Sequence, residues 1–121
     1  MLNDLYAFDL GHVLFKPTKA TKIQFRLNFE GAKSYFIGEN SNYDEDNGFA
    51  FQPWIQVEFE NASVIINEKS ALAMGNYFFT DPKGVKVKVE YTFSYIRDSK
   101  GSLKINLHHS SFPFNDEAYF N

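Results

Sequence analysis

Two histidines and two serines stand together at the end of a strand-like segment, Leu103–Ser111 (LKINLHHSS). Successive side chains of a strand point to opposite faces of its sheet. Strict alternation therefore places on one face Leu103, Ile105, Leu107, His109 and Ser111, and on the other face Lys104, Asn106, His108 and Ser110. The first face is apolar and ends in an imidazole and a hydroxyl, as expected for a pocket with an apolar floor and a polar mouth. We therefore expect a site at His109 and Ser111, the alternative being a polar strand end at the surface.

Metal binding is one chemistry to consider, because three imidazoles suffice for a catalytic zinc ion. His108 and His109, however, are neighbours on one strand and diverge to opposite faces, and His12 is distant in sequence. The acidic segment 42–48 (NYDEDNG) resembles a calcium loop, but its sixth position is asparagine instead of glycine and its twelfth is proline instead of glutamate. We expect no metal cofactor, since the ligand spacing supports neither manganese nor zinc, and we interpret 42–48 as a solvated loop.

Nucleophilic catalysis by a serine that a histidine activates is a second chemistry to consider. Ser111 and His109 lie two residues apart, so on a strand their side chains run parallel instead of meeting. The chain has no glycine-flanked nucleophile motif, and no carboxylate is identifiable that would orient the histidine. What remains is a set of neutral hydrogen-bonding groups and one imidazole at the rim of an aromatic pocket, which suits a small polar or anionic ligand.

The composition limits the kind of partner. The 121 residues, 44% of them apolar, suffice for one core, and we expect a single domain over residues 1–121. Twelve basic and fifteen acidic residues give a net charge of −3 with no basic run, which argues against nucleic acid and anionic membranes as partners. No stretch is apolar and long enough to span a bilayer and the N-terminus lacks a signal-peptide pattern, so a soluble protein is expected.

Aromatic residues are unusually frequent for a chain of this size, with fourteen Phe, seven Tyr and one Trp. The chain has no cysteine, which excludes disulfides, thiolate nucleophiles and thiolate metal sites. The number of rings exceeds what a small core needs, so some of them should line a cavity or an interface.

The first segments of the chain are short and must pack on the rest. Residues 2–9 carry apolar residues at helical spacing. Residues 12–15 form a short apolar run that enters a turn at Lys16-Pro17, with Thr18 at the tip of the turn. Segment 22–27 is strand-like.

A helix follows these segments. Asn28 is its expected N-cap, the helix runs through Ile37, and Gly38 is its expected stop. Its apolar stripe consists of Phe29, Ala32 and Phe36. Tyr35 lies at the border of that stripe, where its ring can pack while its hydroxyl reaches into a cavity.

From residue 54 onward the pattern indicates strands alone. The expected strands are, in chain order, 54–60, 64–66 after a turn at Asn61, 70–80, 85–96 and 103–111. Strand 70–80 is apolar on both faces, as a central strand is, with a bulge or kink at Gly75, and a turn follows at 81–84. A helical start followed by a meander of strands predicts an α+β domain with a mostly antiparallel, curved sheet whose concave face the helices cover.

Several segments resemble a known family. They are 13–18 (VLFKPT), 31–36 (GAKSYF), 71–79 (ALAMGNYFF) and 88–114 (KVEYTFSYIRDSKGSLKINLHHSSFPF). Over residues 10–114 the chain is similar to the calcium/calmodulin-dependent kinase II association-domain family, and within it to the repeats of iota-class carbonic anhydrases. The resemblance implies the nuclear-transport-factor-2-like cone, a strongly curved, mostly antiparallel sheet wrapped around a few helices.

For the iota class the resemblance implies reversible hydration of carbon dioxide to bicarbonate, in a pocket that works without metal in some members and is linked to manganese in others. It maps the family's site residues to Thr18, Tyr35 and the serine of the closing motif, which is Ser111, or Ser110 if the strand register is shifted by one. Alternation favours Ser111, which shares a face with His109. We expect a metal-free carbonate dehydratase in which His109 is the candidate proton acceptor, because the unperturbed imidazole pKa lies near neutrality.

Other functions and arrangements stay open from the sequence. The same fold serves as a non-catalytic dimerisation or oligomerisation module, and as an isomerase or hydrolase for hydrophobic small molecules, although no carboxylate is placed as the base of such an enzyme. The family carries a longer first helix, so the chain is either an excised repeat or has a short helix. The resemblance suggests a location in the plastid in algae, or in the periplasm or cytoplasm in bacteria.

A homodimer is expected through a flat sheet face made of Lys86, Lys88, Thr92, Ser94 and Asn106.

Overall fold

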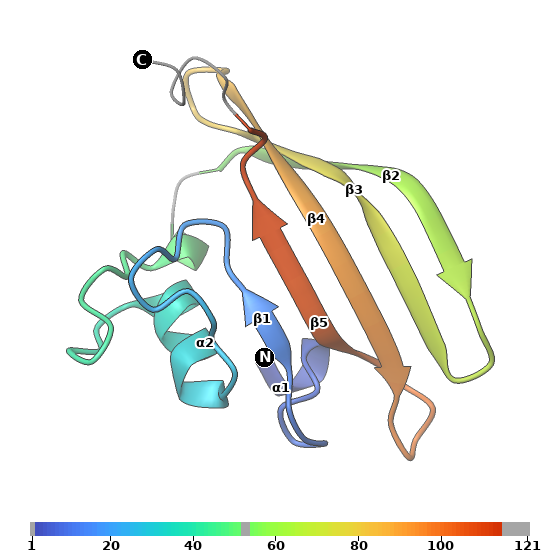
Figure 1. Ribbon diagram of the computed structural model, residues 1–121. Helices are drawn as coiled ribbons and strands as arrows, with labels where there is room; N and C mark the ends of the chain where they lie inside the picture. The colour runs from blue at the N-terminus through green and yellow to red at the C-terminus, as the bar shows by residue number, and fades with distance from the viewer. Residues whose placement is uncertain (1, 52–53, 115–121) are drawn as a thin grey trace.

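The computed structural model describes residues 2–51 and 54–114 (Figure 1). In chain order its elements are α1 (Leu2–Leu5), β1 (Leu14–Lys16), α2 (Phe29–Ile37), the 3-10 helix η1 (Phe49–Phe51), β2 (Gln56–Ile66), β3 (Ser70–Thr80), β4 (Lys86–Arg97) and β5 (Leu103–Ser111). None of the described helices has the length and hydropathy needed to cross a membrane. The chain is α+β, as predicted, with one short strand between the two α-helices and four long strands after them.

One five-stranded sheet forms the body of the fold, in the order β1-β5-β4-β3-β2 (Figure 1). Strands β2 to β5 pair antiparallel, each with the next, and β1 pairs parallel with β5. Gly84 (φ 86°) and Gly101 (φ 82°) lie in the tight connections on either side of β4, where a residue without Cβ adopts positive φ at little cost. The parallel pairing brings the segment that follows β1 beside the C-terminal end of β5.

Helix α2 begins and ends where the sequence predicts. The Asn28 side chain accepts a hydrogen bond from the backbone N–H three residues on at 2.8 Å, and Gly38, at φ 79°, donates its N–H to the carbonyl four residues back at 2.7 Å. The buried face differs from the predicted stripe, because Ala32 and Tyr35 are buried whereas Phe29 is exposed. Tyr35 is therefore a core residue of the helix and not a border residue.

The predicted strand at 22–27 is wrong. The segment runs irregularly past β1, where the Arg26 N–H donates to the Phe15 carbonyl at 2.8 Å. Arg26 is buried, and its Nε donates to the Ile23 carbonyl at 2.8 Å. A buried guanidinium must satisfy its donors, so the backbone here is shaped around that side chain and not by a strand ladder.

The predicted turn at Asn61 is also wrong. Strand β2 continues through this residue, with a bulge between Asn61 and Ser63. The bulge lies opposite Gly75 of β3, where an added Cβ would lie 2.3 Å from the Glu60 carbonyl oxygen. The irregularity expected at Gly75 is thus a close approach of two backbones that only glycine allows.

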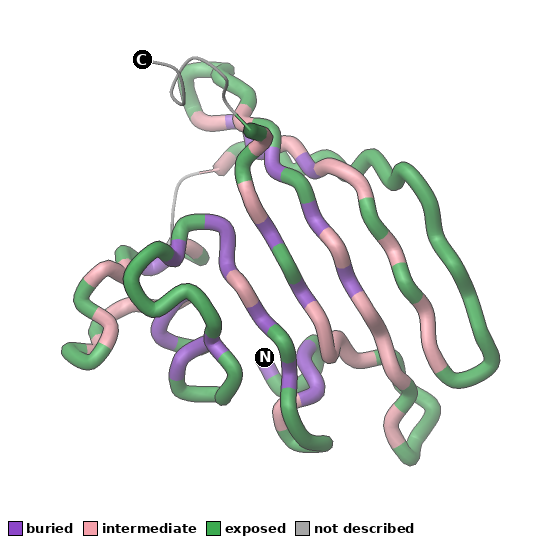
Figure 2. The backbone as a smooth tube through the Cα atoms, viewed as in Figure 1, coloured by how far each residue is buried: buried purple, intermediate pink, exposed green. Residues whose placement is uncertain are grey.

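The helices cover one end of the sheet (Figures 1 and 2). One buried cluster joins α1, β1 and α2 and contains Leu2, Tyr6, Ala7, Val13, Phe15, Ala32 and Tyr35. A second cluster lies on β3 and β4 and contains Tyr77, Phe79, Val89, Tyr91 and Phe93. The edge strand β2 is exposed along its whole length. The core therefore sits between the N-terminal elements and the inner face of β3, β4 and β5.

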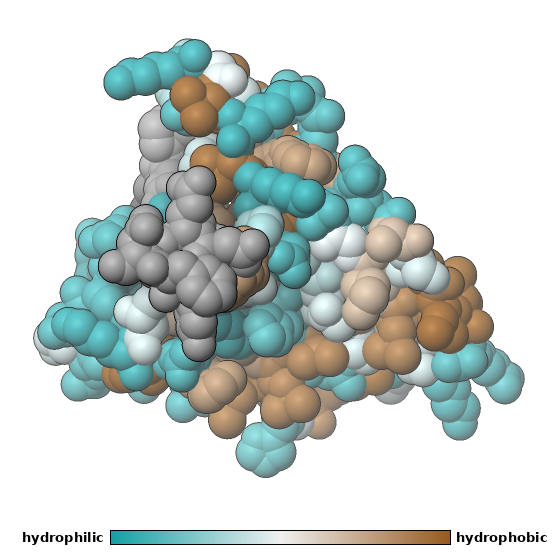
Figure 3. All heavy atoms as spheres, turned by 45° about the horizontal axis from the view of Figure 1, so that its top comes forward, coloured by the Kyte–Doolittle hydropathy of each residue, from teal (hydrophilic) through white to brown (hydrophobic). Residues whose placement is uncertain are grey.

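Exposed apolar side chains gather at the other end of the sheet. Figure 3 shows hydrophobic residues at the right-hand end of the molecule, where the hairpin of β2 and β3 lies in Figure 1. Ile65, Ile66 and Leu72 of this hairpin are exposed by 57%, 78% and 42%. This end of the sheet carries more apolar surface than a solvent-facing hairpin needs.

Candidate active site

A bulge in β5 decides which of its polar side chains face the core. The register of β4 and β5 shifts between Ser94 and Tyr95, which leaves Asn106 as an extra residue on β5. An extra residue reverses the alternation of all residues that follow it. Ile105 and His108 therefore share the inner face although they are three positions apart, and both contact the core.

The prediction that His109 and Ser111 face the apolar pocket is wrong for this reason. His109 is exposed, and both side chains lie on the outer face of the sheet, where they line a surface depression with Lys88 and Thr92 of β4. His109 therefore cannot accept a proton from a ligand held at the inner face. The observed register of β5 is shifted by one residue from strict alternation, so that His108 and Ser110 face the core.

Four hydroxyl groups from four parts of the chain lie at the inner face. Thr18 Oγ1, from the turn after β1, lies 2.7 Å from Ser110 Oγ of β5, and the Tyr77 hydroxyl of β3 is hydrogen-bonded to the same Ser110 oxygen. The Tyr35 hydroxyl of α2 accepts a hydrogen bond from the Lys19 N–H at 3.2 Å. All four hydroxyl residues are at most 9% exposed. The structure thus brings together the predicted Thr18 and Tyr35 with Ser110.

His108 lies on the same face, two residues before Ser110, and among the residues that the structure describes only one of its ring nitrogens has a hydrogen-bond partner. Nδ1 lies 2.8 Å from the Tyr6 hydroxyl. The ring lies between Phe15 and Phe93, at centroid distances of 5.0 and 4.3 Å. Nε2 is buried and has no hydrogen-bond partner among the described residues. A buried nitrogen in this state is the atom expected to meet a water molecule or a ligand.

Burial keeps these groups uncharged. It lowers the pKa of His108 to about 3, and the neighbouring His109 adds to the effect. Burial raises the pKa of Tyr35 to about 12 against opposing hydrogen bonds, and it also raises the pKa of Tyr6 and Tyr77. At neutral pH the site is therefore a set of neutral hydrogen-bond donors and acceptors.

The sequence pattern does not single out two residues of this arrangement, Tyr6 and Tyr77. Tyr6 is hydrogen-bonded to His108, which lies 102 positions further along the chain, and Tyr77 is hydrogen-bonded to Ser110, which lies 33 positions further along. The excess of aromatic residues was the one signal that pointed to such contacts. It indicates that some tyrosines line a site, but it does not indicate which ones.

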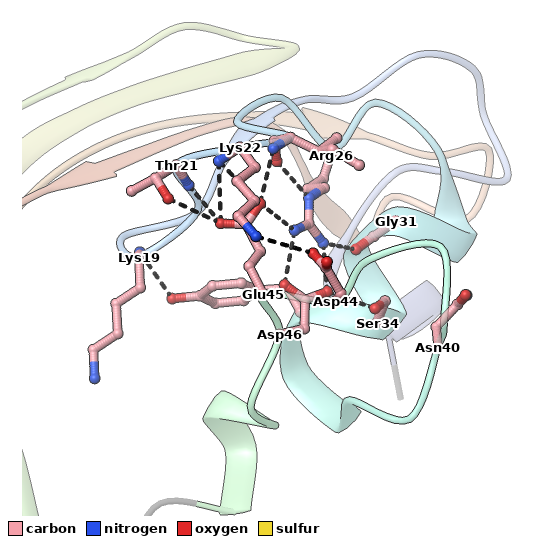
Figure 4. Close-up of polar contacts among 12 residues, drawn as sticks. Lys19, Thr21, Lys22, Arg26, Gly31, Ser34, Asn40, Asp44, Glu45 and Asp46 are labelled. Carbon is pink, nitrogen blue, oxygen red and sulfur yellow. Dashed lines mark hydrogen bonds and ion pairs between the residues drawn. The ribbon is translucent and has the colours of Figure 1, made fainter.

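Residues 21–23, which follow the turn at Thr18, are held by a carboxylate of the acidic segment (Figure 4). Glu45 Oε1 accepts a hydrogen bond from the Thr21 N–H at 2.7 Å, and Oε2 accepts one each from the N–H groups of Ile23 at 2.8 Å and Lys22 at 3.1 Å. Burial alone would raise the Glu45 pKa, but these backbone hydrogen bonds outweigh it and lower the pKa to about 2. The interpretation of segment 42–48 as a solvated loop is therefore wrong at Glu45.

The next residue, Asp46, forms a buried ion pair with Arg26 (Figure 4). Nη1 and Nη2 of Arg26 each donate to one Asp46 oxygen at 2.7 Å, and the two side chains are 0% and 2% exposed. Ser34 Oγ of α2 donates to Asp46 at 2.5 Å. The bidentate pair ties segment 22–27 to the acidic segment, and the Ser34 hydrogen bond ties both to α2, the helix that carries Tyr35.

A small cavity borders the site at Tyr35. Its volume is 30 Å³, and it is lined by Lys19, Tyr35, Glu45, Asp46, Asn47 and Phe49. A cavity must exceed about 10–15 Å³ to admit one water molecule. The space is therefore sufficient for water or for a ligand of very few atoms.

The described residues contain no group of three His, Asp or Glu side chains that could hold a metal ion. His108 and His109 lie on opposite faces of β5, and the carboxylate of Asp46 is engaged by Arg26. The groups that the chain does bring together are hydroxyls and one imidazole.

The amino-acid sequence matches the family model of metal-independent carbonic anhydrases over residues 1–112. The chain belongs to this family. It is 40% identical over 115 residues to the metal-independent carbonic anhydrase of Nostoc sp., in an alignment that covers 94% of this chain and 56% of that protein. The chain thus spans a little over half the length of that relative.

Solved structures agree with this membership. The fold is similar to the crystal structure of the iota-carbonic anhydrase from a cyanobacterium complexed with bicarbonate, with a TM-score of 0.90 and 39% identity over 95% of this chain and 71% of that one. It is also similar to a structure from Xanthomonas campestris described as a calcium/calmodulin-dependent protein kinase II association domain, with a TM-score of 0.60 and 28% identity over 91% and 70% of the two chains. A nuclear-transport-factor-2-like protein from Streptomyces avermitilis, 16% identical with a TM-score of 0.56 over 88% and 70%, shares the fold alone. The predicted fold family is confirmed.

Proposed function

We propose that this chain catalyses the reversible hydration of carbon dioxide to bicarbonate without a metal ion. The observation that carries the proposal is the buried chain of hydroxyls from Tyr77 through Ser110 to Thr18, on the face that also carries His108. Membership of the metal-independent carbonic anhydrase family and the similarity to a cyanobacterial structure that holds bicarbonate support it. The proposed site residues are Thr18, Tyr35, His108 and Ser110.

Both ligands of the reaction suit such surroundings. Carbon dioxide is apolar, and the rings that enclose the site, including Phe15 and Phe93 beside His108, offer it an apolar wall. Bicarbonate is an anion with three oxygens, which the hydroxyls of Thr18 and Ser110 can meet as donors. Fixed donors in a water-poor site stabilise developing negative charge more than water does.

The hydroxyl chain can move the proton that the reaction displaces. As the oxygen of water bonds to the carbon of carbon dioxide, the electron pair of one C=O bond moves onto its oxygen. A hydroxyl can accept a proton on a lone pair while it donates its own, so Thr18 and Ser110 can carry a proton from the attacking water to that oxygen. The carbonic acid that results releases one proton to solvent and leaves as bicarbonate.

His108 acts in this scheme as a hydrogen-bonding group and not as the proton acceptor. Its pKa of about 3 makes it a weak base at neutral pH. Tyr6 holds the ring through Nδ1, and Nε2 is left for a water molecule or a bicarbonate oxygen. The orientation of the ring is therefore set before the ligand arrives.

Stopped-flow hydration of carbon dioxide tests the proposal, with and without a chelator. The wild-type chain should accelerate hydration above the buffer rate, and chelation should leave the rate unchanged. Thr18→Val keeps the shape of the side chain and removes the hydroxyl, so it should lose most of the activity. Thr92→Val makes the same change on the outer face of β4, where Thr92 lines the surface depression, and should keep it. A wild-type rate equal to buffer would refute the activity, and a rate that chelation abolishes and manganese or zinc restores would refute the metal-free route.

We also propose that the chain forms a homodimer through the outer face of the sheet. Leu72 and Met74 of β3 lie on this face and are exposed by 42% and 53%. Met74 also lines a depression of 420 Å³ there with His109 and Ser111. Light scattering at micromolar concentration should give twice the chain mass of 14.0 kDa, and a value equal to one chain would contradict the dimer.

A further inference from the structure

Lys16 ends β1 at the point where the ladder between β1 and β5 stops. Its register partner on β5 is His109. The next residue, Pro17, is fully buried and has no backbone N–H to donate. The ladder therefore ends at Lys16, although β5 runs on through Ser110 and Ser111.

The Lys16 side chain supplies donors beyond this point. Its Nζ donates to the carbonyl oxygen of Ser110 at 3.2 Å and to that of Thr18 at 3.3 Å. These are the two residues whose side-chain hydroxyls lie 2.7 Å apart. A single ammonium group thus joins the two backbone segments that carry the hydroxyl pair.

The surroundings of Lys16 strengthen these contacts. The side chain is half-buried, and burial lowers its pKa. Hydrogen bonds from a charged donor are stronger than those between neutral groups, and they gain further where water is partly excluded. An apolar side chain of the same length would leave both carbonyls without this donor.

We propose that Lys16 is a positioning residue, whose ammonium group fixes the separation of Thr18 and Ser110 so that their hydroxyls stay in contact. Its effect on catalysis rests on the proposed function, whereas its effect on the geometry does not. A proton relay works only while its oxygens are within hydrogen-bond distance, and small displacements of reacting groups lower the rate steeply. Loss of the ammonium group should therefore reduce kcat more than it raises KM.

Three variants test this positioning role. Lys16→Met keeps the length of the stem and removes the charge and the donors, whereas Lys16→Arg keeps both. Lys83→Met removes an exposed lysine from the turn between β3 and β4 and is the matched control. We expect kcat to fall by about 10- to 100-fold in Lys16→Met with KM changed by less than about threefold, and to return to within about threefold of wild type in Lys16→Arg. Lys83→Met should keep the wild-type kcat, and so should Lys16→Met if the proposal is wrong.

The Cβ chemical shifts of Thr18 and Ser110 provide a second measurement that does not depend on activity. They should move in Lys16→Met and stay at their wild-type values in Lys16→Arg and Lys83→Met. Unchanged shifts in Lys16→Met would overturn the positioning role. If Lys16→Met does not fold, the Lys16→Arg variant decides the question. Wild-type chemical shifts and kcat in Lys16→Arg support the proposal, and displaced chemical shifts in that variant contradict it. A wild-type chain that does not hydrate carbon dioxide refutes the proposed function, and the chemical shifts still decide on Lys16.

Discussion

The Tyr6 hydroxyl lies 2.8 Å from Nδ1 of His108, although 102 positions of the chain separate the two residues. Two local irregularities produce this contact. Tyr6 forms an isolated bridge with Ile105, and the extra residue Asn106 then turns His108 to the inner face beside it. The short N-terminal segment is therefore part of the site as well as a cover for the core.

Tyr6→Phe should lower both stability and activity. The change removes the partner of Nδ1 and leaves a buried imidazole nitrogen unpaired, which costs about 1–3 kcal/mol of the free energy of unfolding. The ring of residue 6 still packs on Phe15, at 5.3 Å between centroids in the wild type, so no large cavity forms. Urea unfolding measures the first effect, and stopped-flow hydration measures the second.

Tyr95→Phe is the matched control for this change. It also removes one phenolic hydroxyl, from a ring that packs on Phe93 at 5.8 Å. It should change the free energy of unfolding by less than about 0.5 kcal/mol and leave the hydration rate at the wild-type value. If the two variants behave alike, the contact between Tyr6 and His108 does not orient the imidazole.

Ser110→Ala and Ser111→Ala should differ widely in activity. Ser110 is 1% exposed and bonded to both Thr18 and Tyr77, whereas Ser111 lies on the outer face. Loss of one preorganised donor lowers kcat by about 10²- to 10³-fold, so Ser110→Ala should be nearly inactive and Ser111→Ala nearly normal. Equal activities, measured by stopped flow on samples with equal melting temperatures, would contradict the inner-face site.

Strand β5 illustrates how far sequence alternation can be trusted. Its bounds, Leu103 to Ser111, are those predicted, because the flanking turn and the apolar run are local signals. The assignment of its faces failed after Asn106, because a polar residue between two apolar ones is typical of an ordinary strand position as well as of a bulge. The bulge is set by pairing with β4, which is tertiary information.

The acidic segment 42–48 differs from its predicted solvated state for a related reason. The cap at Asn28 and the stop at Gly38 depend on neighbours within four residues, and both were predicted correctly. The ion pair of Arg26 with Asp46 joins residues 20 positions apart. Charged residues are rarely buried, so an acidic stretch is typical of a solvated loop, and composition does not indicate which carboxylate has a buried partner.

Acid should destabilise the protein through His108. Burial holds the pKa of the folded state at about 3, whereas the unfolded chain has a value of about 6.5. Between these two pH values the unfolded state binds a proton at His108 and the folded state does not. The contribution of His108 to the free energy of unfolding is therefore complete above about pH 6.5 and is lost as the pH falls toward 3. The slope is up to about 1.4 kcal/mol per pH unit. Urea unfolding at several pH values should show a flatter dependence for His108→Leu than for His109→Leu. Equal slopes would contradict the buried neutral imidazole.

Glu45→Gln should loosen the segment 21–23 that follows the turn at Thr18. The wild-type carboxylate accepts hydrogen bonds from three consecutive backbone N–H groups, at residues 21 to 23, and lies 3.6 Å from Nη2 of Arg26. An amide has one acceptor oxygen and no charge, so at least one of these N–H groups loses its partner, which costs about 1–3 kcal/mol. Because this segment follows the turn at Thr18 and Lys19 within three residues, the hydration rate should fall together with the melting temperature.

Asp44→Asn is the control that separates the backbone hydrogen bonds of Glu45 from a general effect of charge. Asp44 precedes Glu45 in the same acidic segment, but its side chain is 76% exposed and its ion pair with Lys22 is 3.5 Å long. Exposed pairs of this kind contribute little to stability, so Asp44→Asn should keep the wild-type melting temperature and hydration rate. Both variants remove one negative charge, and hence a difference between them measures the backbone hydrogen bonds of Glu45. If Glu45→Gln melts and reacts like Asp44→Asn, the carboxylate does not hold residues 21–23, and the position of Thr18 does not depend on Glu45.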